Sequence, residues 1–404
     1  MLSPGKVDLF PGSPSLPYGP MARIALKSSA LVSPSNDGYL VYDVETERLH
    51  HLNPTASLVI ELCDGTRDVD AIRDALLPLL DDTGWDPCRV WLEGVLRDGL
   101  LVEGANSGPS ISAERLTALA TGLWEQDYVL PAFICQQRAA ELEPDNARIW
   151  YDLGELAYII GRRDEACAAY QRYLEKRPGD AEIEHLLVSL RGETPPERVA
   201  DRCIEQLYAR FAKFYDETMT HDLEYRGPAL LGEAVAVALA GRHQLDVVDL
   251  GCGTGLSGQS LRPLAKRLAG VDLSPAMIER ARVRDVYDAL HVSEITTFLR
   301  ECDGRFDLIA ACDTLIYFGD LRQVVPLAAR RLAPGGIVAF TVERSDAYPF
   351  QLTDSGRFAH HPDHLREVAG RSGLDIASMD DAILRYEYGN QVSGLVAVFR
   401  KSIL

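Results

Sequence analysis

A glycine-rich turn after an apolar run constrains this chain more than any other feature. Residues 247–250 form a short apolar run that is typical of a buried parallel strand. Gly251, Gly253 and Gly255 follow it, and glycine lets the backbone turn tightly and approach a ligand closely. The spacing is G-x-G-x-G, because Leu256 holds the sixth place, and it therefore differs from the G-x-G-x-x-G of a dinucleotide site. The pattern predicts a strand that ends in a ligand-binding loop.

Two carboxylates flank this loop. Asp249 stands just before the first glycine, at the mouth of the loop, where its charge suits a cationic ligand and repels a pyrophosphate. Asp272 lies at the end of a second predicted strand, where a carboxylate can accept hydrogen bonds from both hydroxyls of a ribose. The loop with both acids is a much stronger signal than the glycines alone. The alternative is a tight strand-to-helix turn that binds nothing.

The last part of the chain, residues 200–404, resembles the Rossmann-like class I S-adenosylmethionine-dependent methyltransferases, and the resemblance covers roughly residues 200 to 402. The resemblance implies a seven-stranded α/β domain that binds S-adenosyl-L-methionine, with the glycines against its methionine part, Asp249 near its amino group and Glu294 by the adenine. It assigns to the cofactor Asp249, Gly251, Cys252, Gly253, Gly255, Asp272, Leu273, Met277, Ser293, Glu294, Ile295, Asp313 and Tyr215. The remaining strands are expected at residues 290–294, 306–313, 337–341, 384–388 and 394–400.

An aromatic, amphipathic segment precedes this domain. Residues 204–225 resemble the lid of methyltransferases that are fused to tetratricopeptide repeats, which implies that Tyr208, Phe214 or Tyr215 covers the cofactor. Ordinary packing of a helix on the core is the alternative for each of these rings.

Methyl transfer mainly requires that donor and nucleophile meet in line at about 3 Å. A base is needed if the acceptor must lose a proton, whereas a carboxylate acceptor needs none. Tyr317, after the fourth strand, and His360, which matches a histidine of the related repeat-fused enzymes, are the catalytic candidates. A substrate hydrogen bond or a structural cap is the other interpretation of His360. No cluster has metal-ligand spacing, so we expect no metal.

The front of the chain, residues 21–104, predicts a small α+β winged-helix domain. Strands are expected at 39–43 and 48–52, helices from 54 to 62, from 69 to 80 and from 87 to 98, and a last strand at 100–103. The words GYLVYD (38–43), HLNPTA (51–56), ELCDGT (61–66) and DGLL (98–101) resemble the peptide chaperone of pyrroloquinoline quinone biosynthesis, the type member of the recognition elements for ribosomally made, post-translationally modified peptides.

This second resemblance implies that a leader peptide adds as a strand beside residues 48–52, with the third helix as the other wall. The residues it assigns to the peptide are Arg48, Leu49, His50, His51, Leu52, Trp91 and Val95, with Val90, Gly94 and Arg97 along the wall. A winged-helix DNA binder and an inert spacer are the alternatives.

The middle of the chain, residues 111–195, has an internal period of 34 residues and follows a linker at 104–109. Its second copy fits the tetratricopeptide pattern through Trp150, Leu153, Gly154, Gly161, Ala166, Tyr170 and Pro178. The first copy, 113–146, is degenerate, and residues 181–190 are interpreted as a capping helix. Two copies form a rigid spacer, a dimerisation surface or a small peptide groove.

Composition limits the partners. The net charge of −19 argues against nucleic acid and anionic membranes. The eight cysteines contain no C-x-x-C, no apolar run approaches the roughly 20 residues of a membrane span, and residues 1–20, with five prolines, are expected to be a disordered arm. We therefore expect a cytoplasmic protein, and a homodimer is one possible assembly.

The three parts together predict a tailoring enzyme. The front domain would hold the leader of a precursor peptide while the rear domain methylates its core, with O-methylation of a carboxylate slightly favoured over N-methylation. The alternatives are a small-molecule methyltransferase with protein-interaction domains and a non-enzymatic peptide escort. The intact glycines, Asp249 and Asp272 count against the escort.

Overall fold

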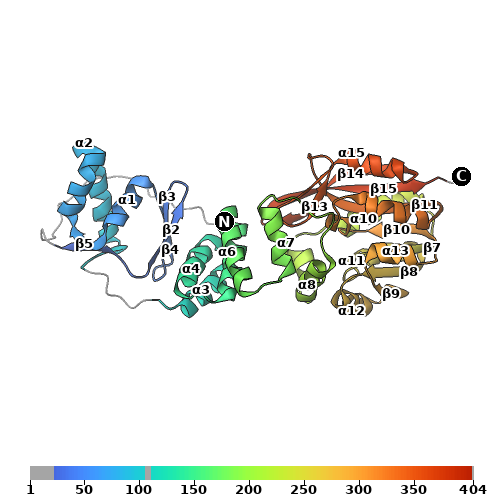
Figure 1. Ribbon diagram of the computed structural model, residues 1–404, viewed down its shortest axis with the longest axis horizontal. Coiled ribbons are helices and arrows are strands. Elements are labelled where there is room, and N and C mark those ends of the chain that lie inside the picture. The colour runs from blue at the N-terminus through green and yellow to red at the C-terminus, as the bar shows by residue number, and fades with distance from the viewer. Residues whose placement is uncertain (1–21, 105–110, 403–404) are drawn as a thin grey trace. The chain divides into compact units, whose positions relative to one another are not determined.

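The computed structural model of the protein describes residues 22–104 and 111–402, without the side chains of residues 81–83. The expected arm at 1–20 lies outside the described residues. The chain forms two compact units, residues 1–176 and 177–404 (Figure 1). Each unit has its own core, and we describe each by itself.

The first unit begins with a β-rich domain. Its six strands form two antiparallel sheets, ordered β2-β3-β4 and β5-β1-β6. Val41, Val59, Ile72 and Leu92 form the centre of the core between the sheets and two helices. The elements are β1 (Arg23–Leu26), β2 (Ala30–Ser35), β3 (Gly38–Asp43), β4 (Arg48–Leu52), α1 (Pro54–Leu62), β5 (Asp64–Asp68), α2 (Val69–Arg97) and β6 (Leu101–Glu103).

The structure corrects the sequence interpretation of this domain in two places. Residues 64–68, expected to be a turn between helices, form strand β5, with Gly65 in the left-handed region at φ 84°. The two helices expected at 69–80 and 87–98 form one helix, α2, with Pro78 and Pro87 inside it. Apolar side chains from both halves of α2 pack in one core, which offsets the backbone bonds that the prolines remove.

Four helices complete the first unit: α3 (Ala113–Glu125), α4 (Val129–Leu142), α5 (Ala147–Ile159) and α6 (Arg163–Lys176). Helix α3 packs against α4, and α5 packs against α6. A Cβ atom on Gly154 would lie 2.5 Å from the Tyr170 ring, so α5 and α6 pack this closely only with glycine there. The Arg162 guanidinium donates to the Pro34 carbonyl at 2.7 Å, which ties the helices to β2. The helical middle that the sequence predicts is therefore present.

The second unit is built on a nine-stranded sheet. Its main strands follow the order β9-β8-β7-β10-β11-β15-β14, in which only β15 runs antiparallel to its neighbours. They are β7 (Leu245–Leu250), β8 (Ala265–Asp272), β9 (Ala289–Val292), β10 (Phe306–Ala311), β11 (Leu332–Arg344), β14 (Leu374–Glu387) and β15 (Asn390–Lys401). All seven expected strands are present. The hairpin of β12 (Phe350–Leu352) and β13 (Phe358–His360) is an addition that was not predicted.

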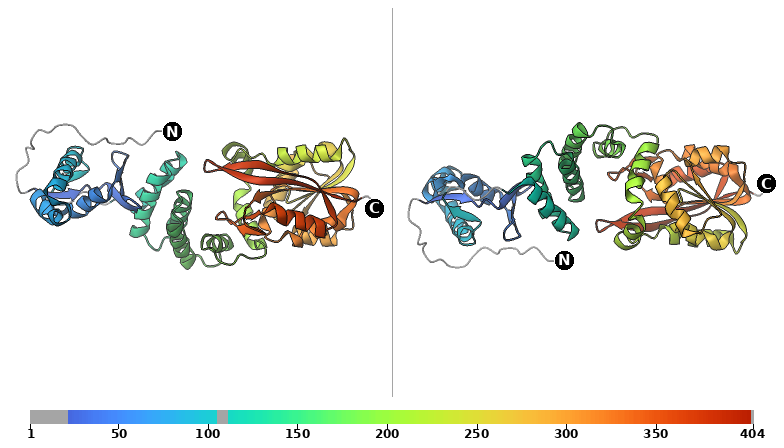
Figure 2. Two further views of the ribbon diagram at one scale, coloured as in Figure 1. Left: turned by 90° about the horizontal axis from the view of Figure 1, so that it is seen from above. Right: turned by 90° about the horizontal axis from the view of Figure 1, so that it is seen from below.

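Helices cover both faces of this twisted sheet, as Figure 2 shows. On one face, Val235 of α10 (Gly227–Leu239) and Leu261 of α11 (Leu256–Leu261) pack on β7 and β10. On the other face, α13 (Ile295–Glu301), α14 (Val325–Arg331) and α15 (Pro362–Arg371) bury their apolar sides. Helix α12 (Pro275–Arg284) follows β8. This is a Rossmann-like α/β arrangement.

The helix that was interpreted as a repeat cap belongs to the second unit. Helix α7 (Ala181–Leu190) packs against the loop of the β12–β13 hairpin. The His185 ring nitrogen Nε2 lies 2.8 Å from the Gly356 carbonyl, and the Ser189 hydroxyl donates to the Thr353 carbonyl. Helices α8 (Asp201–Phe211) and α9 (Tyr215–Glu217) then lead to the sheet.

The eight cysteines are free thiols, and six of them are buried. Burial raises the pKa of Cys63, Cys135 and Cys203 to about 12, so these thiols remain protonated. Within residues 22–104 and 111–402, no helix combines the length and apolar character that crossing a bilayer requires.

Candidate active site

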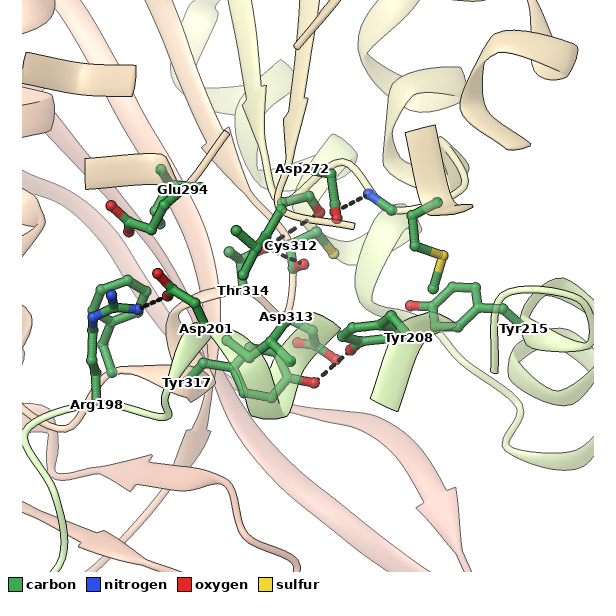
Figure 3. A pocket seen from close by; sticks show the side chains of 17 residues that line it. Arg198, Asp201, Tyr208, Tyr215, Asp272, Glu294, Cys312, Asp313, Thr314 and Tyr317 are labelled. Atoms are coloured by element: carbon green, nitrogen blue, oxygen red, sulfur yellow. Dashed lines mark hydrogen bonds and ion pairs between the residues drawn. The ribbon is translucent and has the colours of Figure 1, made fainter. Parts of the chain in front are cut away.

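A cavity opens at the carboxyl ends of β7, β8 and β10, where the strand order reverses (Figure 3). Ligands of doubly wound sheets bind at such a switch point. The lining residues come from the strand ends and from the segment that precedes α10: Arg198, Asp201, Ile204, Tyr208, Tyr215, Gly251, Gly253, Asp272, Leu273, Met277, Glu294, Ile295, Cys312, Asp313, Thr314, Tyr317 and Phe318.

The glycine loop forms the floor of the cavity. Gly251 and Gly253 have φ values of 68° and 54°, in the left-handed region that favours glycine. A Cβ atom on Gly251 would lie 2.2 Å from the Thr314 hydroxyl oxygen, so glycine is required for packing there. Around Gly253 nothing lies within 4 Å of that position. A side chain at 253 would fill the cavity, and glycine leaves the backbone open to a ligand.

Asp272 is a carboxylate of the cavity wall that two backbone N–H groups hold in place. Its Oδ2 accepts the Gly253 N–H and its Oδ1 accepts the Ser274 N–H, both at 2.8 Å. Burial raises the pKa of Asp272, although these backbone bonds oppose the shift. Each oxygen keeps a second lone pair, so the side chain can still accept hydrogen bonds from two hydroxyl groups.

Asp249 lies beneath the loop and not on the cavity surface. It is fully buried, and its Oδ2 accepts the Ser257 and Tyr287 hydroxyls, each at 2.7 Å. Its Oδ1 has no partner among the described residues. Burial raises the pKa of Asp249 to about 6, with the two hydroxyl bonds opposing. A buried carboxylate oxygen without a donor favours a cationic ligand group above the loop.

Glu294 lines the cavity, but its carboxylate is occupied by helix α13. It caps that helix, accepting the Thr296 N–H at 2.9 Å, the Thr296 hydroxyl at 2.6 Å and the Thr297 N–H at 2.8 Å. Although burial opposes it, these bonds lower the pKa of Glu294. The neighbouring Ile295 gives this part of the cavity an apolar surface.

Aromatic side chains of α8 and α9 form the roof. Tyr208 and Tyr215 line the cavity, whereas Phe214 is 54% exposed and does not. The Tyr208 hydroxyl is hydrogen-bonded to that of Tyr317, and the two rings meet edge to face, with centroids 6.2 Å apart. Burial raises the pKa of all three lining tyrosines, so their hydroxyls remain neutral donors.

A separate contact ties the roof to the loop. Asp216 of α9 accepts the Thr254 hydroxyl at 2.5 Å and pairs with the Arg284 guanidinium. Arg284 also donates to the Thr254 carbonyl at 2.8 Å. The roof segment is therefore anchored to the glycine loop that forms the floor.

The structure does not bring His360 to the cavity. Its side chain on β13 is completely buried, beside the Phe350 ring and stacked on His364, with centroids 6.1 Å apart. Burial lowers the pKa of His360 to about 3, so the ring is neutral. The geometry therefore gives no support to a catalytic base at this position, because all three side chains of β13 are buried in the interior.

Most of the expected cofactor residues meet at one place. Nine of them line the cavity together with Tyr317: Tyr215, Gly251, Gly253, Asp272, Leu273, Met277, Glu294, Ile295 and Asp313. Asp249, Cys252, Gly255 and Ser293 are not on its lining. The lining residues that were not predicted are Arg198, Asp201, Ile204, Cys312, Thr314 and Phe318. Thr314 and Phe318 follow the fourth strand directly and could have been found there, whereas Arg198 and Asp201 belong to no motif.

Two family models match separate parts of the chain. Residues 248–340 match the methyltransferase domain family, which covers the cavity from the glycine loop to β11. Residues 38–85 match the coenzyme PQQ synthesis protein D family, which covers β3, β4, α1 and the first half of α2.

Several relatives of known name are similar to part of this chain. A malonyl-[acyl-carrier protein] O-methyltransferase of Salmonella typhimurium is 31% identical over 145 residues, 36% of this chain and 57% of that protein. A ubiquinone biosynthesis O-methyltransferase of Bordetella bronchiseptica is 27% identical over 219 residues, 48% of this chain and 88% of that protein. The solved structure of the N-methyltransferase NodS from Bradyrhizobium japonicum with S-adenosyl-L-homocysteine is 21% identical, covering 43% of this chain and 86% of that one, with a TM-score of 0.35.

Proposed function

We propose that this protein is a peptide methyltransferase. Its second unit is an S-adenosylmethionine-dependent methyltransferase domain, and its first unit carries a PqqD-like domain. The PqqD-like domain binds the leader of a ribosomally made precursor, and the second unit methylates its core. The observation that carries this proposal is the unpaired edge of β4, present in the same chain as the cofactor cavity.

The cavity fits S-adenosyl-L-methionine, which supplies a methyl group on a sulfonium centre. The backbone of the glycine loop, which is open at Gly253, would hold its methionine part, and Asp272 would accept its ribose hydroxyls. The unpaired Oδ1 of Asp249 would complement the amino group through the loop. Ile295 would pack on the adenine. Tyr208 and Tyr215 would exclude water from above.

The peptide-binding edge is strand β4. Among the described strands β4 pairs only with β3, so its second edge is open. Leu52 faces the core, while Arg48 and His51 are exposed. On α2, the half-buried Trp91 and Val95 pack against the same core. An open strand edge can bind an extended peptide by strand addition.

The cavity favours an acceptor that needs no deprotonation. Its tyrosines are neutral, and Asp313 is engaged by the Arg385 guanidinium at 2.9 Å and by the Thr341 hydroxyl. Both carboxylate oxygens of Asp313 thus already accept a hydrogen bond. A carboxylate oxygen of the core peptide is therefore favoured over a protonated amine, with the Tyr317 hydroxyl as a donor to the acceptor. The two relatives compared above are both O-methyltransferases, which agrees with this preference.

The helical segment serves as a tetratricopeptide-like spacer in this proposal. The period of 34 residues and the close packing of Gly154 on Tyr170 support it. A covalent link between the leader site and the second unit raises the effective concentration of the core there. Association of two chains through these helices is the alternative use of the same surface.

A small-molecule methyltransferase is the second candidate, because one of the relatives is named for ubiquinone biosynthesis. One experiment separates the two. The full chain is incubated with S-adenosyl-L-methionine and synthetic peptides encoded by short reading frames beside its gene, and the products are measured by mass spectrometry. We expect one methyl group on a peptide core. Methylation of a metabolite, with no peptide modified at any concentration, would favour the second candidate.

A further inference from the structure

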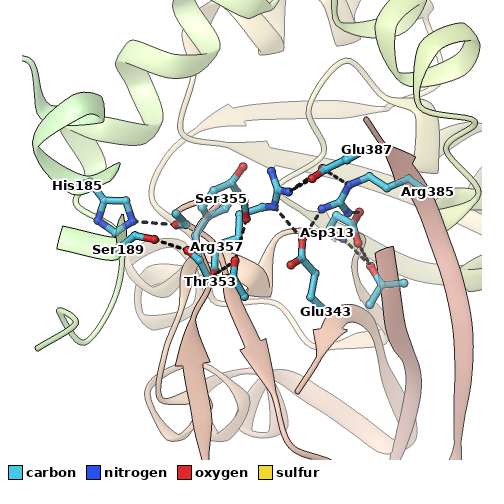
Figure 4. Close-up of polar contacts among 12 residues, drawn as sticks. His185, Ser189, Asp313, Glu343, Thr353, Ser355, Arg357, Arg385 and Glu387 are labelled. Atoms are coloured by element: carbon cyan, nitrogen blue, oxygen red, sulfur yellow. Dashed lines mark hydrogen bonds and ion pairs between the residues drawn. The ribbon is translucent and has the colours of Figure 1, made fainter. Parts of the chain in front are cut away.

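Five charged side chains form a network beside the cofactor cavity, in which Arg385 and Glu343 are buried and the other three are half-buried (Figure 4). Arg385 of β14 donates to Asp313 at 2.9 Å and to Glu387 at 2.7 Å, and it also binds Glu343. Arg357, just before β13, donates to Glu343 at 2.7 Å and to Glu387 at 2.6 Å. Three carboxylates meet two guanidinium groups, which gives the network a net charge of −1.

The network lies at the edge of the sheet where the methyl acceptor, the second substrate of the enzyme, is expected to bind. Its carboxylates lie at or just beyond the carboxyl ends of β10, β11 and β14, and ligands bind outside such ends. Asp313 also lines the cofactor cavity, and Arg357 and Arg385 are close enough to Tyr317 to influence its electrostatics. Asp313 therefore joins the network to the cavity wall, whereas the other four members do not line the cavity.

Stability alone does not account for this cluster. Arg385 is 3% exposed and Glu343 is 7% exposed, and burying ion pairs of this kind is often no better than apolar packing. Asp313 also has a left-handed backbone, φ 46°, which is uncommon outside glycine. Thr341 holds it there, accepting the Asp313 N–H at 2.7 Å while donating to its carboxylate. Such local strain is typical of a functional site.

Two atoms of the network are left without a partner among the described residues. All three nitrogens of Arg385 are engaged, and Glu343 Oε1 receives both arginines. Glu343 Oε2 and Arg357 Nη1 have no hydrogen bond to the described chain. One is an acceptor and the other is a donor.

We propose that Glu343 and Arg357 form the acceptor subsite and hold an amide group of the peptide beside the atom that is methylated. An amide presents one N–H, which Glu343 Oε2 accepts, and one carbonyl, which Arg357 Nη1 binds. An amide is neutral, so binding it adds no charge to the network. The subsite rests on the proposed function, because it assumes a peptide acceptor.

Arg357 is held in place from behind by α7. The Thr353 hydroxyl and N–H both donate to the Arg357 carbonyl, at 2.9 and 2.8 Å. Ser189 and His185 of α7 bind the carbonyls of Thr353 and Gly356 in the same loop. Arg385 is the positioning residue of the subsite, since it holds Glu343 and shares Glu387 with Arg357.

Two conservative variants of the full chain test the subsite. Glu343→Gln keeps an oxygen for both arginines and turns the free acceptor atom into an N–H₂ donor. Arg357→Lys keeps the charge but places all its donors on one nitrogen, so it cannot reproduce the separate contacts of Nε and Nη2 and the free donor of Nη1. Arg267→Lys is the matched control, because Arg267 forms an exposed bidentate pair with Asp246 away from the cavity.

The probes are S-adenosyl-L-methionine in calorimetry, the gene-adjacent peptide that wild type methylates as the substrate in steady-state kinetics, and N-acetylglycine methylamide as a neutral amide competitor. In both variants we expect an unchanged cofactor Kd and a KM for the peptide raised about tenfold or more, the effect of one lost bond to a charged group. The diamide should inhibit wild type and Arg267→Lys but not Glu343→Gln.

The unfolding curve of each variant is measured as well. If a variant has a lower melting temperature than wild type, the test uses inhibition of wild type by the diamide instead of that variant. Peptide turnover with unchanged KM in both folded variants, or no inhibition of wild type by the diamide, would overturn the subsite and leave the proposed function standing. Failure of wild type to methylate any peptide would overturn both.

Discussion

The hydroxyl groups of Tyr208 and Tyr317 share a hydrogen bond, which joins α8 to the 3-10 turn Leu315–Tyr317 after β10. One partner belongs to the roof of the cavity and the other to the wall at the strand ends. The roof is thus fixed at two points, here and at Asp216 under Arg284. The cavity is preorganised by contacts within the second unit.

Tyr208→Phe tests this closure. Removing one neutral hydrogen bond should cost about 0.5–1.5 kcal/mol, so we expect cofactor affinity to fall by about two- to tenfold while the melting temperature changes little. Tyr128→Phe is the control, because Tyr128 is 47% exposed in the first unit. Calorimetry with S-adenosyl-L-homocysteine measures the affinity of both variants. Equal affinities for the two variants would show that the pair does not close the cavity.

Asp272→Ala tests the cofactor class. The variant loses charge-assisted bonds to two hydroxyls, and its affinity for S-adenosyl-L-methionine should fall by about 1–3 kcal/mol. Wild type should not bind nicotinamide dinucleotides, because Asp249 and the G-x-G-x-G spacing oppose a pyrophosphate. Asp303→Ala, at an exposed position, serves as the control. Tight binding of the dinucleotide, or unchanged affinity in Asp272→Ala, would contradict this assignment.

Local signals made the floor of the cavity predictable. The apolar strand β7, the glycines that need positive φ, and Asp272 at the next strand end lie within one short stretch. Each follows from backbone conformation and strand geometry, which a sequence shows directly. Strand β4 was also predicted with the bounds that the structure has, because its turn and alternating side chains are local.

Features that depend on distant partners were not predictable. Residues 64–68 become a strand only because β1 pairs with them, and the β12–β13 hairpin exists because β13 joins the far end of β11. The network of Glu343 with Arg357 and Arg385 joins residues 14 and 42 positions apart. His360 was interpreted as a cleft residue because the sequence does not show that β13 turns its side chains inward.

His360→Gln tests the role of that histidine. The ring is neutral and away from the cavity, so kcat should stay within about threefold, whereas a lost general base would cost about 10²–10⁴. The lowered pKa of about 3 means that the neutral form is favoured in the folded state. The contribution of neutral His360 to the free energy of unfolding is complete above 6.5, the pKa of histidine in the unfolded chain, and is lost as the pH falls toward 3. Activity assays and acid unfolding measure both effects. A pH–rate limb that disappears in the variant would instead identify a base.

Asp249 should make the unliganded protein less stable as pH rises. Its folded pKa of about 6 lies above the ordinary 3.8, so the unfolded chain ionises first and stability falls between about pH 4 and 6. Asp249→Asn keeps acceptors for Ser257 and Tyr287 but cannot ionise. Relative to wild type, the variant should gain about 2–3 kcal/mol between pH 4 and 7. Urea unfolding at both pH values measures this difference, and parallel pH profiles would refute it.

The leader-binding edge is tested by proline substitutions on neighbouring residues of β4. In an antiparallel pair the N–H groups of successive residues alternate between the partner strand and the open edge. One of Leu49→Pro and His50→Pro therefore removes a donor toward β3, and the other removes a donor that only an added peptide strand would use. The first should melt the domain, and the second should leave it folded.

The folded variant is the informative one. It should bind cofactor as wild type does, because the cavity lies in the other unit. Its turnover of full-length precursor should fall mainly through a higher KM, since binding through the leader contributes equally to the ground and transition states. A leaderless core should be methylated poorly and equally by wild type and variant. If the folded variant methylates the full precursor with the KM of wild type, the leader does not bind at β4, and the PqqD-like domain has another role.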